Sequence, residues 1–378
     1  MITVETITTV EGFLALESVW NRVLEKCSNE NLCLTFEWFT SWLAGFGGGK
    51  NLFVLVIRKD GVIIGFAPLM ITHTRYRNLP ASEVGFIQND YSPSSDFIIY
   101  ENQAEAISAV IDYLLALQNW DVISLRNMPK DSPNYPALVQ TLAQKGIIYG
   151  TGPGLSSPFI RIQTDWETFM ASRTRKFRKA IRNKMNRIKK WGAYEIKTID
   201  TIDDNGSVLE HIFAISKNSW KADYDKDIVS NDNNMRFFTA LSKTAARKGW
   251  LKIWLLNVDG KPVAYEYHLA YKGRLHALRS DYDRSYRLSS PGSILDMHIV
   301  ENAFSGHVRE YDMCGSSDFY KLNWTSDIRE HARILIFRDT VYGRMLYFLE
   351  FKVISLLKKY EPVKKLREAF LSQTYVRH

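Results

Sequence analysis

One acidic and one imidazole side chain lie two residues apart in a strand predicted at 262–271. Successive side chains of a strand point to opposite faces, so Glu266 and His268 share one face. A carboxylate beside an imidazole is a candidate pair for general acid–base chemistry. Tyr282 and Asp283, which follow the next predicted strand, add a phenol and a second carboxylate. Each of these side chains could instead face solvent or form a hydrogen bond with a neighbouring side chain. The pattern therefore supplies candidates rather than assignments.

The segment that follows predicts an anion site at the start of a helix. Within Leu288–Ser293 a strand gives way to a helix, with Ser290 as the N-cap and a proline in the first turn. A helix N-terminus offers free N–H groups and partial positive charge, which suit a pyrophosphate. A glycine there permits close approach of a ligand, and upstream arginines can pair with phosphate oxygens. The candidate residues are Arg284, Arg287, Ser290, Gly292 and Ser293, and an ordinary capped helix is the alternative.

A strongly basic segment precedes this region. Ten Lys or Arg and no acidic residue occur from Arg173 to Lys190, whereas the whole chain has a net charge of +8. Apolar residues recur at helical spacing in the segment, which predicts an amphipathic helix. Like charges one turn apart repel, so either this face is simply solvated or an anion lies nearby, with Arg175 and Arg178 as its candidate ligands. A nucleotide diphosphate, an RNA backbone and an anionic membrane surface all remain open.

The C-terminal segment 340–378 is a second basic region, with eight basic and three acidic residues. Its apolar spacing predicts a long amphipathic helix that ends at Pro362. Such a helix could pack across the body, or it could lie on the inner membrane leaflet with its lysines toward anionic headgroups. Those lysines are Lys358, Lys359, Lys364 and Lys365.

Composition excludes several classes of protein. The 378 residues are 46% hydrophobic and 24% charged, as expected for a globular protein of two domains. No apolar run approaches the ~18 residues of a membrane span, and Met1–Val10 lacks the features of a secretory signal. Three cysteines cannot form a disulfide framework, and the eight histidines are scattered without ligand spacing. We therefore expect a reduced, cytoplasmic protein that holds no metal.

An internal repeat indicates a duplicated α/β domain. Residues 52–69 and 251–269 each read as strand, Asp-Gly turn, strand, and two predicted helices precede each of them. The stretch 149–158 is rich in Gly, Ser and Pro, which makes it the best candidate for a domain boundary. Helices are predicted at 11–27, 36–46, 103–118, 134–145, 205–220, 232–248 and 291–305, and further strands at 84–87, 96–100, 121–126, 193–199, 274–281, 309–313 and 332–338.

The pattern from Gly260 onward resembles GNAT-superfamily acyltransferases of the CelD/BcsL type, associated with cellulose and other exopolysaccharides. It reads GKPVAYEYHLAYKGRLHALRSDYDRSYRLSSPGSILDMHIVENAFSGHVREYDMCGSSDFYKLNW. The basic pattern RxxRKxxRNxxxRxxxxG at Arg175–Gly192, the segment FEWFTSW and the hairpin GVIIGFAPL fit the same family. The resemblance implies an α/β (α+β) fold of two tandem GNAT-like domains, each a mixed, mainly antiparallel sheet flanked by helices. The implied division is 1–155 for a degenerate N-terminal domain, 156–339 for the acyltransferase domain and 340–378 for a basic amphipathic helix.

The resemblance also implies a site for acetyl-CoA or another acyl-CoA as donor. The strand ending near Asp281 would be the splayed strand that pairs with pantetheine, and Arg287–Ser293 would be the pyrophosphate loop. That loop departs from the usual Arg/Gln-x-x-Gly-x-Gly/Ala pattern, because only one glycine remains, displaced by two positions. The implied residues are Glu266, His268 or Asp283 as the base for an attacking amine, Tyr282 as the acid for the thiolate, and Asp312, Tyr320 and Lys321 as substrate binders. Asp312 and Lys321 could equally form a structural ion pair.

Three functions follow from these observations. The leading hypothesis is an acyl-CoA-dependent N-acyltransferase that acts on an amine of a sugar or of an envelope or exopolysaccharide precursor. The second is a Fem-type transferase, which resembles GNAT proteins, uses aminoacyl-tRNA and would hold RNA through the basic helix. The third is a catalytically degenerate GNAT fold that serves as a binding module in a polysaccharide-secretion system. The acceptor, the acyl chain length and the oligomeric state are not determined by these patterns.

Overall fold

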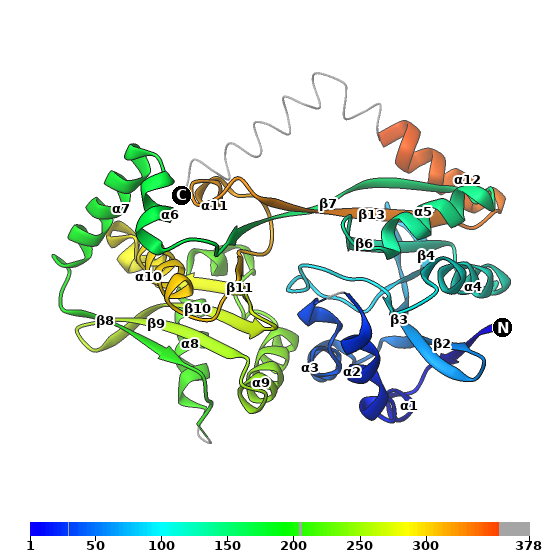
Figure 1. Cartoon of the computed structure of the whole chain (residues 1–378), viewed down its shortest axis with the longest axis horizontal. Helices are drawn as coiled ribbons and strands as arrows, with labels where there is room; N and C mark the ends of the chain where they lie inside the picture. The colour runs from blue at the N-terminus through cyan, green and yellow to red at the C-terminus, as the bar shows by residue number, and fades with distance from the viewer. Residues whose placement is uncertain (29, 204–205, 355–378) are drawn as a thin grey trace.

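The computed structural model describes residues 1–28, 30–203 and 206–354 (Figure 1). The first half comprises β1 (Ile2–Ile7), α1 (Val10–Leu14), α2 (Glu17–Lys26), η1 (Leu32–Leu34), α3 (Phe36–Phe46), β2 (Asn51–Lys59), β3 (Val62–Tyr76), β4 (Leu79–Phe86), β5 (Ile98–Ile99), α4 (Gln103–Ala116), β6 (Val122–Pro129), α5 (Asn134–Gln144) and β7 (Tyr149–Arg161). The second half comprises α6 (Trp166–Ser172), α7 (Arg175–Ile188), β8 (Tyr194–Ile199), α8 (Ser207–Lys217), η2 (Trp220–Tyr224), α9 (Asp232–Arg247), β9 (Leu251–Val258), β10 (Lys261–Tyr271), β11 (Arg274–Tyr282), η3 (Arg284–Ser289), α10 (Pro291–Ser305), β12 (Glu310–Asp312), α11 (Phe319–Leu322), β13 (Ile328–Phe337), α12 (Val341–Phe348) and η4 (Leu349–Val353).

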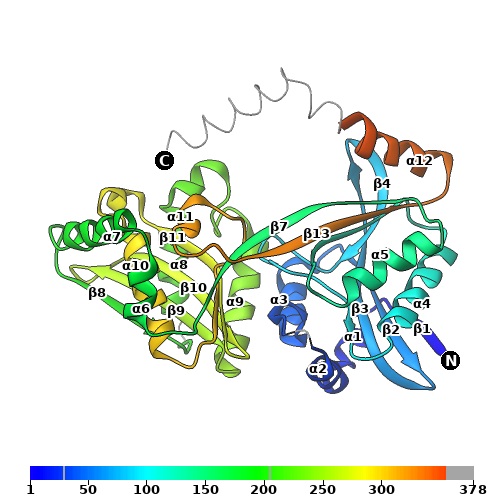
Figure 2. The same ribbon diagram turned by 45° about the horizontal axis from the view of Figure 1, so that its top comes forward.

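One mixed sheet of 13 strands runs through the described part of the chain. Its order is β1-β2-β3-β4-β6-β13-β7-β12-β11-β10-β9-β8, and β5 pairs with β3. Each half repeats one topology, in which a strand, helices and a mainly antiparallel meander are followed by a helix and a parallel strand. The parallel pairs are β4 with β6 and β11 with β12. Helices gather in two lobes, which the long strands β7 and β13 connect (Figure 2). The predicted tandem fold is confirmed.

The two predicted hairpins turn at equivalent places. Asp60 and Gly61 have φ of 50° and 84°, and Asp259 and Gly260 have φ of 49° and 77°. Two consecutive residues of positive φ make the tight turn whose twist matches that of the flanking strands. These turns relate the two halves by an offset of 199 residues. Ala67 of the first half therefore occupies the place that Glu266 holds in the second, so the first half lacks the candidate base.

Residues 149–158, predicted as a domain boundary, lie within strand β7. This strand pairs with β13 and then with β12, while β13 also pairs with β6. Glycine is needed here for close packing, because a Cβ at Gly150 would overlap the Phe351 ring and one at Gly154 would lie 3.0 Å from the His331 backbone. The two halves thus share hydrogen-bonded strands. The division at residue 155 falls within β7 and remains a prediction.

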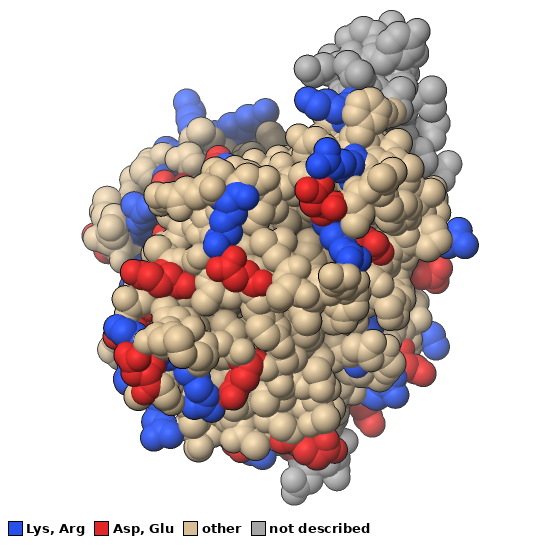
Figure 3. Space-filling view, turned by 90° about the vertical axis from the view of Figure 1, so that its right-hand side faces the viewer, with Lys and Arg blue, Asp and Glu red and all other residues tan. Residues whose placement is uncertain are grey.

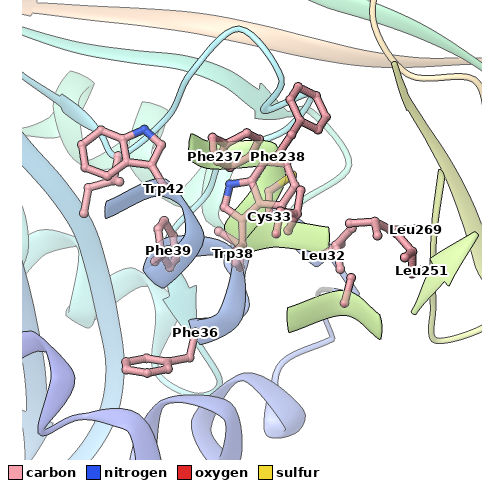
Figure 4. Packing of buried hydrophobic residues seen from close by; sticks show 14 of the residues in the cluster. Leu32, Cys33, Phe36, Trp38, Phe39, Trp42, Phe237, Phe238, Leu251 and Leu269 are labelled. Carbon is pink, nitrogen blue, oxygen red and sulfur yellow. The ribbon is translucent and has the colours of Figure 1, made fainter. Parts of the chain in front are cut away.

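A hydrophobic core also joins the two halves (Figure 4). The rings of Trp38 on α3 and Phe237 on α9 meet edge to face with centroids 5.5 Å apart, and Phe238 packs in the same cluster. Gly45 permits this approach of the helices, because a Cβ there would lie 2.7 Å from the Asn233 carbonyl oxygen. Burial of such large rings contributes strongly to stability. The two halves are therefore held against each other by a shared hydrophobic core.

The described part of the C-terminal segment packs against the body as α12 and η4. Glu350 is buried and accepts hydrogen bonds from Arg77 at 2.6 Å and Arg333 at 2.7 Å. Burial alone would raise the pKa of this carboxyl, but the two guanidinium groups lower it to about 2. None of the described helices is long and apolar enough to span a bilayer. The predicted membrane-facing lysines, Lys358, Lys359, Lys364 and Lys365, lie outside the described residues.

Candidate active site

A cleft opens where the parallel strands β11 and β12 separate. They pair only over Arg274–His276 and Glu310–Asp312. Beyond this point β11 continues along β10, and Leu278 forms a bulge that shifts the register between these two strands. The resulting central cleft has a volume of about 590 Å³. Its lining includes residues 277–280 of β11, residues 313–315 after β12, parts of η2 and α11, and side chains from the first half.

Two carboxyl groups, Glu266 of β10 and Asp296 of α10, line this cleft and interact with each other. Burial first, and then the neighbouring Asp296, raise the pKa of Glu266 well above its ordinary value. Burial also raises the pKa of Asp296 to about 6, although Glu266 lowers it by hydrogen bonding. Two such carboxyls cannot both ionise easily, so the pair holds one proton and one negative charge near neutral pH. A carboxyl pair of this kind can accept a proton from a reacting group.

Sequence reasoning found Glu266 and missed Asp296. The signal was present: Asp296 is the one acidic residue in the apolar run that begins α10, and it lies one helical turn beyond Gly292 and Ser293. Residues three or four apart share a helix face. The acid therefore lies on the face that carries the predicted anion-binding residues.

His268 lies beside Glu266 but does not line the cleft. Its Nε2 is 3.6 Å from the Glu266 carboxylate and 3.2 Å from the Tyr311 hydroxyl, and its side chain is fully buried. Burial lowers the pKa of His268 to about 3, so the ring is neutral at physiological pH. The structure therefore places this imidazole next to Glu266 but behind the cleft lining, where it does not reach a substrate in the cleft.

Tyr282 and Asp283 also lie off the cleft lining. Tyr282 is half-buried at the end of β11, and burial raises the pKa of its phenol. Asp283 is buried and is the N-cap of η3, where it accepts hydrogen bonds from the backbone N–H and the hydroxyl of Ser285 at 2.9 and 2.6 Å. This N-capping geometry gives Asp283 a structural role. Arg284 points to Asp223, at 2.7 Å, so this predicted phosphate ligand is held in a surface ion pair.

The start of α10 has a different geometry from the predicted cap. The backbone of Ser290 adopts the left-handed helical conformation, with φ of 59°, and its side chain makes no capping hydrogen bond. Its carbonyl instead accepts from the Ser293 N–H at 3.1 Å. Side-chain capping needs an extended Ncap residue, and the tight turn out of η3 imposes a left-handed one. A Cβ added to Gly292 would face open space, so room for a ligand exists above the first turn.

Helix α7 supplies cations to this turn. Lys184 donates a hydrogen bond to the Ser293 hydroxyl at 2.7 Å, and Arg187 donates to the Leu288 carbonyl at 3.0 Å. Burial lowers the pKa of Lys184, while Asp296 raises it. The predicted ligands Arg175 and Arg178 lie instead toward the other end of α7. Free backbone near Gly292 together with two cations fits a pyrophosphate, so the residues present suit an acyl-CoA.

The last three predicted substrate binders separate into two places. Tyr320 and Lys321 line the cleft, and Lys321 donates to the Cys314 carbonyl at 2.6 Å. Asp312 lies in the seam between the halves and accepts from Arg329 at 3.0 Å. His276, Asp312 and Cys314 bring potential metal ligands within 4.8 Å of one another. The Arg329 guanidinium already neutralises the Asp312 charge there. Asp312 is thus in an ion pair, but with Arg329 and not with Lys321, the partner that the sequence left as an alternative.

A buried ionic cluster forms one wall of the cleft. Asp281 forms ion pairs with Lys221 and Arg279, each at 2.8 Å, and accepts hydrogen bonds from Tyr265 at 2.7 Å and Ser216 at 2.9 Å. Burial alone would raise the pKa of Asp281, but Lys221 and Arg279 hold it below its ordinary value. The cluster joins α8, η2, β10 and β11, and it presents Lys221 and Arg279 to the cleft. Sequence reasoning noticed Asp281 only as the end of a strand.

The first half contributes the opposite wall. β4 pairs with β3 as far as Phe86, and the chain returns to β3 only at Ile98. In the second half the equivalent interval of β11 contains only the bulge. The excursion of residues 87–97 carries Asp90, Tyr91 and Pro93 to the central cleft, where Tyr91 stacks on Phe237 with centroids 6.0 Å apart. The half expected to be degenerate therefore helps to shape the cleft.

Residues 175–322 match the family model described as an acetyltransferase (GNAT) domain. The chain contains a GNAT acetyltransferase domain. The match runs from α7 to the end of α11, so it includes the parting strands, the Glu266–Asp296 pair and the turn at Gly292. The protein is accordingly an acyltransferase.

Solved structures extend the likeness beyond the GNAT domain. FemX is similar with a TM-score of 0.60 and 13% identity, over 90% of this chain and 100% of that one. L-PGS from Bacillus licheniformis has a TM-score of 0.54 and 12% identity, over 90% and 96%. The C-terminal domain (DUF2156) of a putative lysylphosphatidylglycerol synthetase from Agrobacterium fabrum has a TM-score of 0.53 and 10% identity, over 87% and 96%. At these identities the likeness concerns the fold. No curated protein matches the sequence.

Proposed function

We propose that this protein is an acyl-CoA-dependent N-acyltransferase of the CelD/BcsL type. It transfers an acyl group, acetyl in the simplest case, to an amine of a sugar or of an envelope or exopolysaccharide precursor. The Glu266–Asp296 pair carries the proposal, because an attacking amine must lose a proton and the ionised member of the pair can accept it. We place the enzyme in the cytoplasm, peripheral at the inner membrane face.

The proposed reaction uses the cleft as follows. Acyl-CoA supplies an activated thioester, and the turn at Gly292 with Lys184 and Arg187 holds its pyrophosphate. The amine nitrogen attacks the thioester carbonyl carbon, its proton passes to the carboxyl pair, and the C–S bond breaks. The departing thiolate takes up the proton that the carboxyl pair has accepted from the amine, which returns the pair to its starting state. Backbone groups of β11 beyond His276, unpaired on the β12 side, bind the pantetheine arm.

Binding of the donor is testable without knowledge of the acceptor. Acetyl-CoA should raise the melting temperature, since a ligand at about 100 times its Kd stabilises by about 2.7 kcal/mol. Gly292→Trp should abolish the shift, because the open space above Gly292 admits the indole, which then fills the phosphate site. The measurement is a thermal-shift titration with acetyl-CoA, a longer acyl-CoA and desulfo-CoA. Gly48→Trp, at an equally open glycine of the first half, is the matched control. No shift with any CoA at millimolar concentration would contradict the proposed donor.

The first half should influence binding of the amine acceptor and not binding of the acyl-CoA donor. Asp90 is exposed in the cleft opposite β11, where it can pair with an ammonium group of the acceptor. Asp90→Asn should raise the KM for the amine by about tenfold, the loss expected for one charge-assisted hydrogen bond. Steady-state kinetics with a panel of amino sugars would measure this, with the KM for acetyl-CoA unchanged. Glu105→Gln on α4 is the control, and an equal rise in both KM values would contradict the assignment.

A Fem-type donor is the second candidate, favoured by the basic face of α7 near the start of α10. Use of aminoacyl-tRNA would make binding strongly dependent on salt and would leave RNA bound through purification. Absorbance at 260 nm before and after ribonuclease treatment distinguishes this from acyl-CoA use. A non-catalytic binding module would instead lose function in Arg175 or Arg178 variants and keep it when Glu266 and Asp283 are replaced.

A further inference from the structure

Helix α7 presents a face of cations, and none of its Lys or Arg side chains forms an ion pair with any described carboxylate. Exposed cations occur along the whole helix and just beyond it. They are Arg175, Lys176, Lys179, Arg182, Arg187, Lys189 and Lys190. The end of the molecule formed by the first half looks different, because basic and acidic side chains are interspersed there (Figure 3). The single-sign surface is therefore a local feature and not a consequence of the net charge alone.

Exposed apolar side chains lie at both ends of this helix. At its C-terminal end, Leu288 of η3 is 62% exposed and Trp191 is 38% exposed. Arg187 ties η3 to the helix through the Leu288 carbonyl. At the N-terminal end, Phe319 and Leu322 of α11 are 82% and 42% exposed.

Packing holds α11 close to the N-terminal end of α7. The Phe177 ring on α7 meets the Trp324 ring, just beyond α11, with centroids 4.8 Å apart. Arg173 also donates a hydrogen bond to the Trp324 carbonyl. Large apolar side chains thus flank the cations on a packed framework.

We propose that this α7 face, formed by α7, Trp191, Leu288 and α11, docks on an anionic lipid bilayer. Cations that meet anionic headgroups, combined with Trp, Phe and Leu at the headgroup boundary, are what interfacial binding requires. An RNA backbone would also satisfy the cations. It would leave the aliphatic Leu288 and Leu322 in water, however, because single-stranded bases stack on aromatic rings. The apolar residues therefore favour lipid.

Docking in this way would bring the central cleft to the membrane surface. Tyr320 lies between the exposed Phe319 and the buried Lys321 on α11, and it lines the cleft. A bilayer under α11 would thus lie beside the cleft mouth, which suits an acceptor or an acyl chain anchored in lipid. This step rests on the proposed N-acyltransferase function, whereas the docking itself does not.

Vesicle co-sedimentation of the full chain tests the docking. Phosphatidylcholine vesicles should bind the protein weakly, and addition of phosphatidylglycerol should give strong binding that falls with salt. Lys176→Gln with Lys179→Gln should weaken this binding about 25-fold, at about fivefold for each cation. Phe319→Ser with Leu322→Ser should weaken it roughly tenfold or more. Lys50→Gln with Val62→Ser, an exposed cation and an exposed apolar side chain of the first half, is the matched control and should bind as the wild type does.

Two results would overturn the proposal. One is binding that does not require phosphatidylglycerol, or that is unchanged in both double variants of the α7 face. The other is absent vesicle binding together with tight binding of unfractionated tRNA that depends on Lys176 and Lys179 but not on Phe319 and Leu322, which would make this an RNA surface. Thermal shift with acetyl-CoA in the same variants separates the two proposals. Docking can fail while donor binding persists, and donor binding can fail while docking persists.

Discussion

Glu266→Gln and Asp296→Asn should each lower kcat/KM by about 10³-fold, within the range that general-base catalysis contributes. Each variant removes one member of the carboxyl pair, so the attacking amine loses its proton acceptor. Steady-state kinetics with acetyl-CoA and a reactive amino sugar would measure the loss. Asp112→Asn, an exposed carboxylate paired with Lys145 on the first half, is the matched control. Full activity in either cleft variant would exclude the pair from the reaction.

The pH dependence provides a second readout that a merely structural role would not move. The pKa of Asp296 is raised to about 6 by burial. As the pH falls through about 6, the pair takes up a second proton and can no longer accept one from the amine. The wild-type rate should therefore fall below about pH 6. In Asp296→Asn this acidic limb of the pH–rate profile should be absent. A limb that persists in the variant would assign the titration to another group.

Asp281→Ala should destabilise the protein by about 3–5 kcal/mol, the largest effect expected on folding. The substitution leaves Lys221 and Arg279 buried without their shared carboxylate. Chemical denaturation would measure the free energy of unfolding. Asp223→Ala removes a partner from the exposed pair with Arg284 and should cost only about 0–1 kcal/mol. A loss of less than about 1 kcal/mol in Asp281→Ala would show that the cluster is not a stabilising element.

The pH dependence of stability should follow from the same cluster. Lys221 and Arg279 hold the pKa of Asp281 below its ordinary value despite burial. A carboxyl with a lowered folded-state pKa contributes stability that is present above its unfolded pKa and is lost as the pH falls through the folded value. The stability difference between wild type and Asp281→Ala should therefore shrink in acid, below the ordinary Asp pKa.

Local patterns accounted for most of the elements. The strand–Asp-Gly–strand repeats became β2–β3 and β9–β10, because a tight turn of positive φ depends on the residues within it. Residues 149–158 were predicted as a domain boundary, since Gly, Ser and Pro usually interrupt structure, and in the structure they lie within β7. Their role in β7 depends on the Phe351 ring and the His331 backbone, which press against Gly150 and Gly154 from distant parts of the chain.

The candidate site shows the same division. Glu266 and the helix start at Gly292 were recognisable, because strand alternation and Pro-Gly at a helix start are local signals. Other contacts of the site join elements that are far apart in sequence, so no local signal predicts them. They are the ion pairs of Arg284 with Asp223 and of Asp312 with Arg329, and the hydrogen bond from Lys184 to Ser293. The pairing of Glu266 with Asp296 likewise needs α10 to lie across β10.

By itself, the sequence determined the order of strands and helices, the tandem fold and the basic character of α7, because periodicity, turn residues and charge are carried by neighbours along the chain. Only the tertiary structure decided which acids share a proton, which cations face a ligand and which half supplies each wall of the cleft. Desolvation and pairing depend on what packs against a side chain. That packing is set by the parting of β11 from β12 and by the 87–97 excursion, which no local pattern specifies.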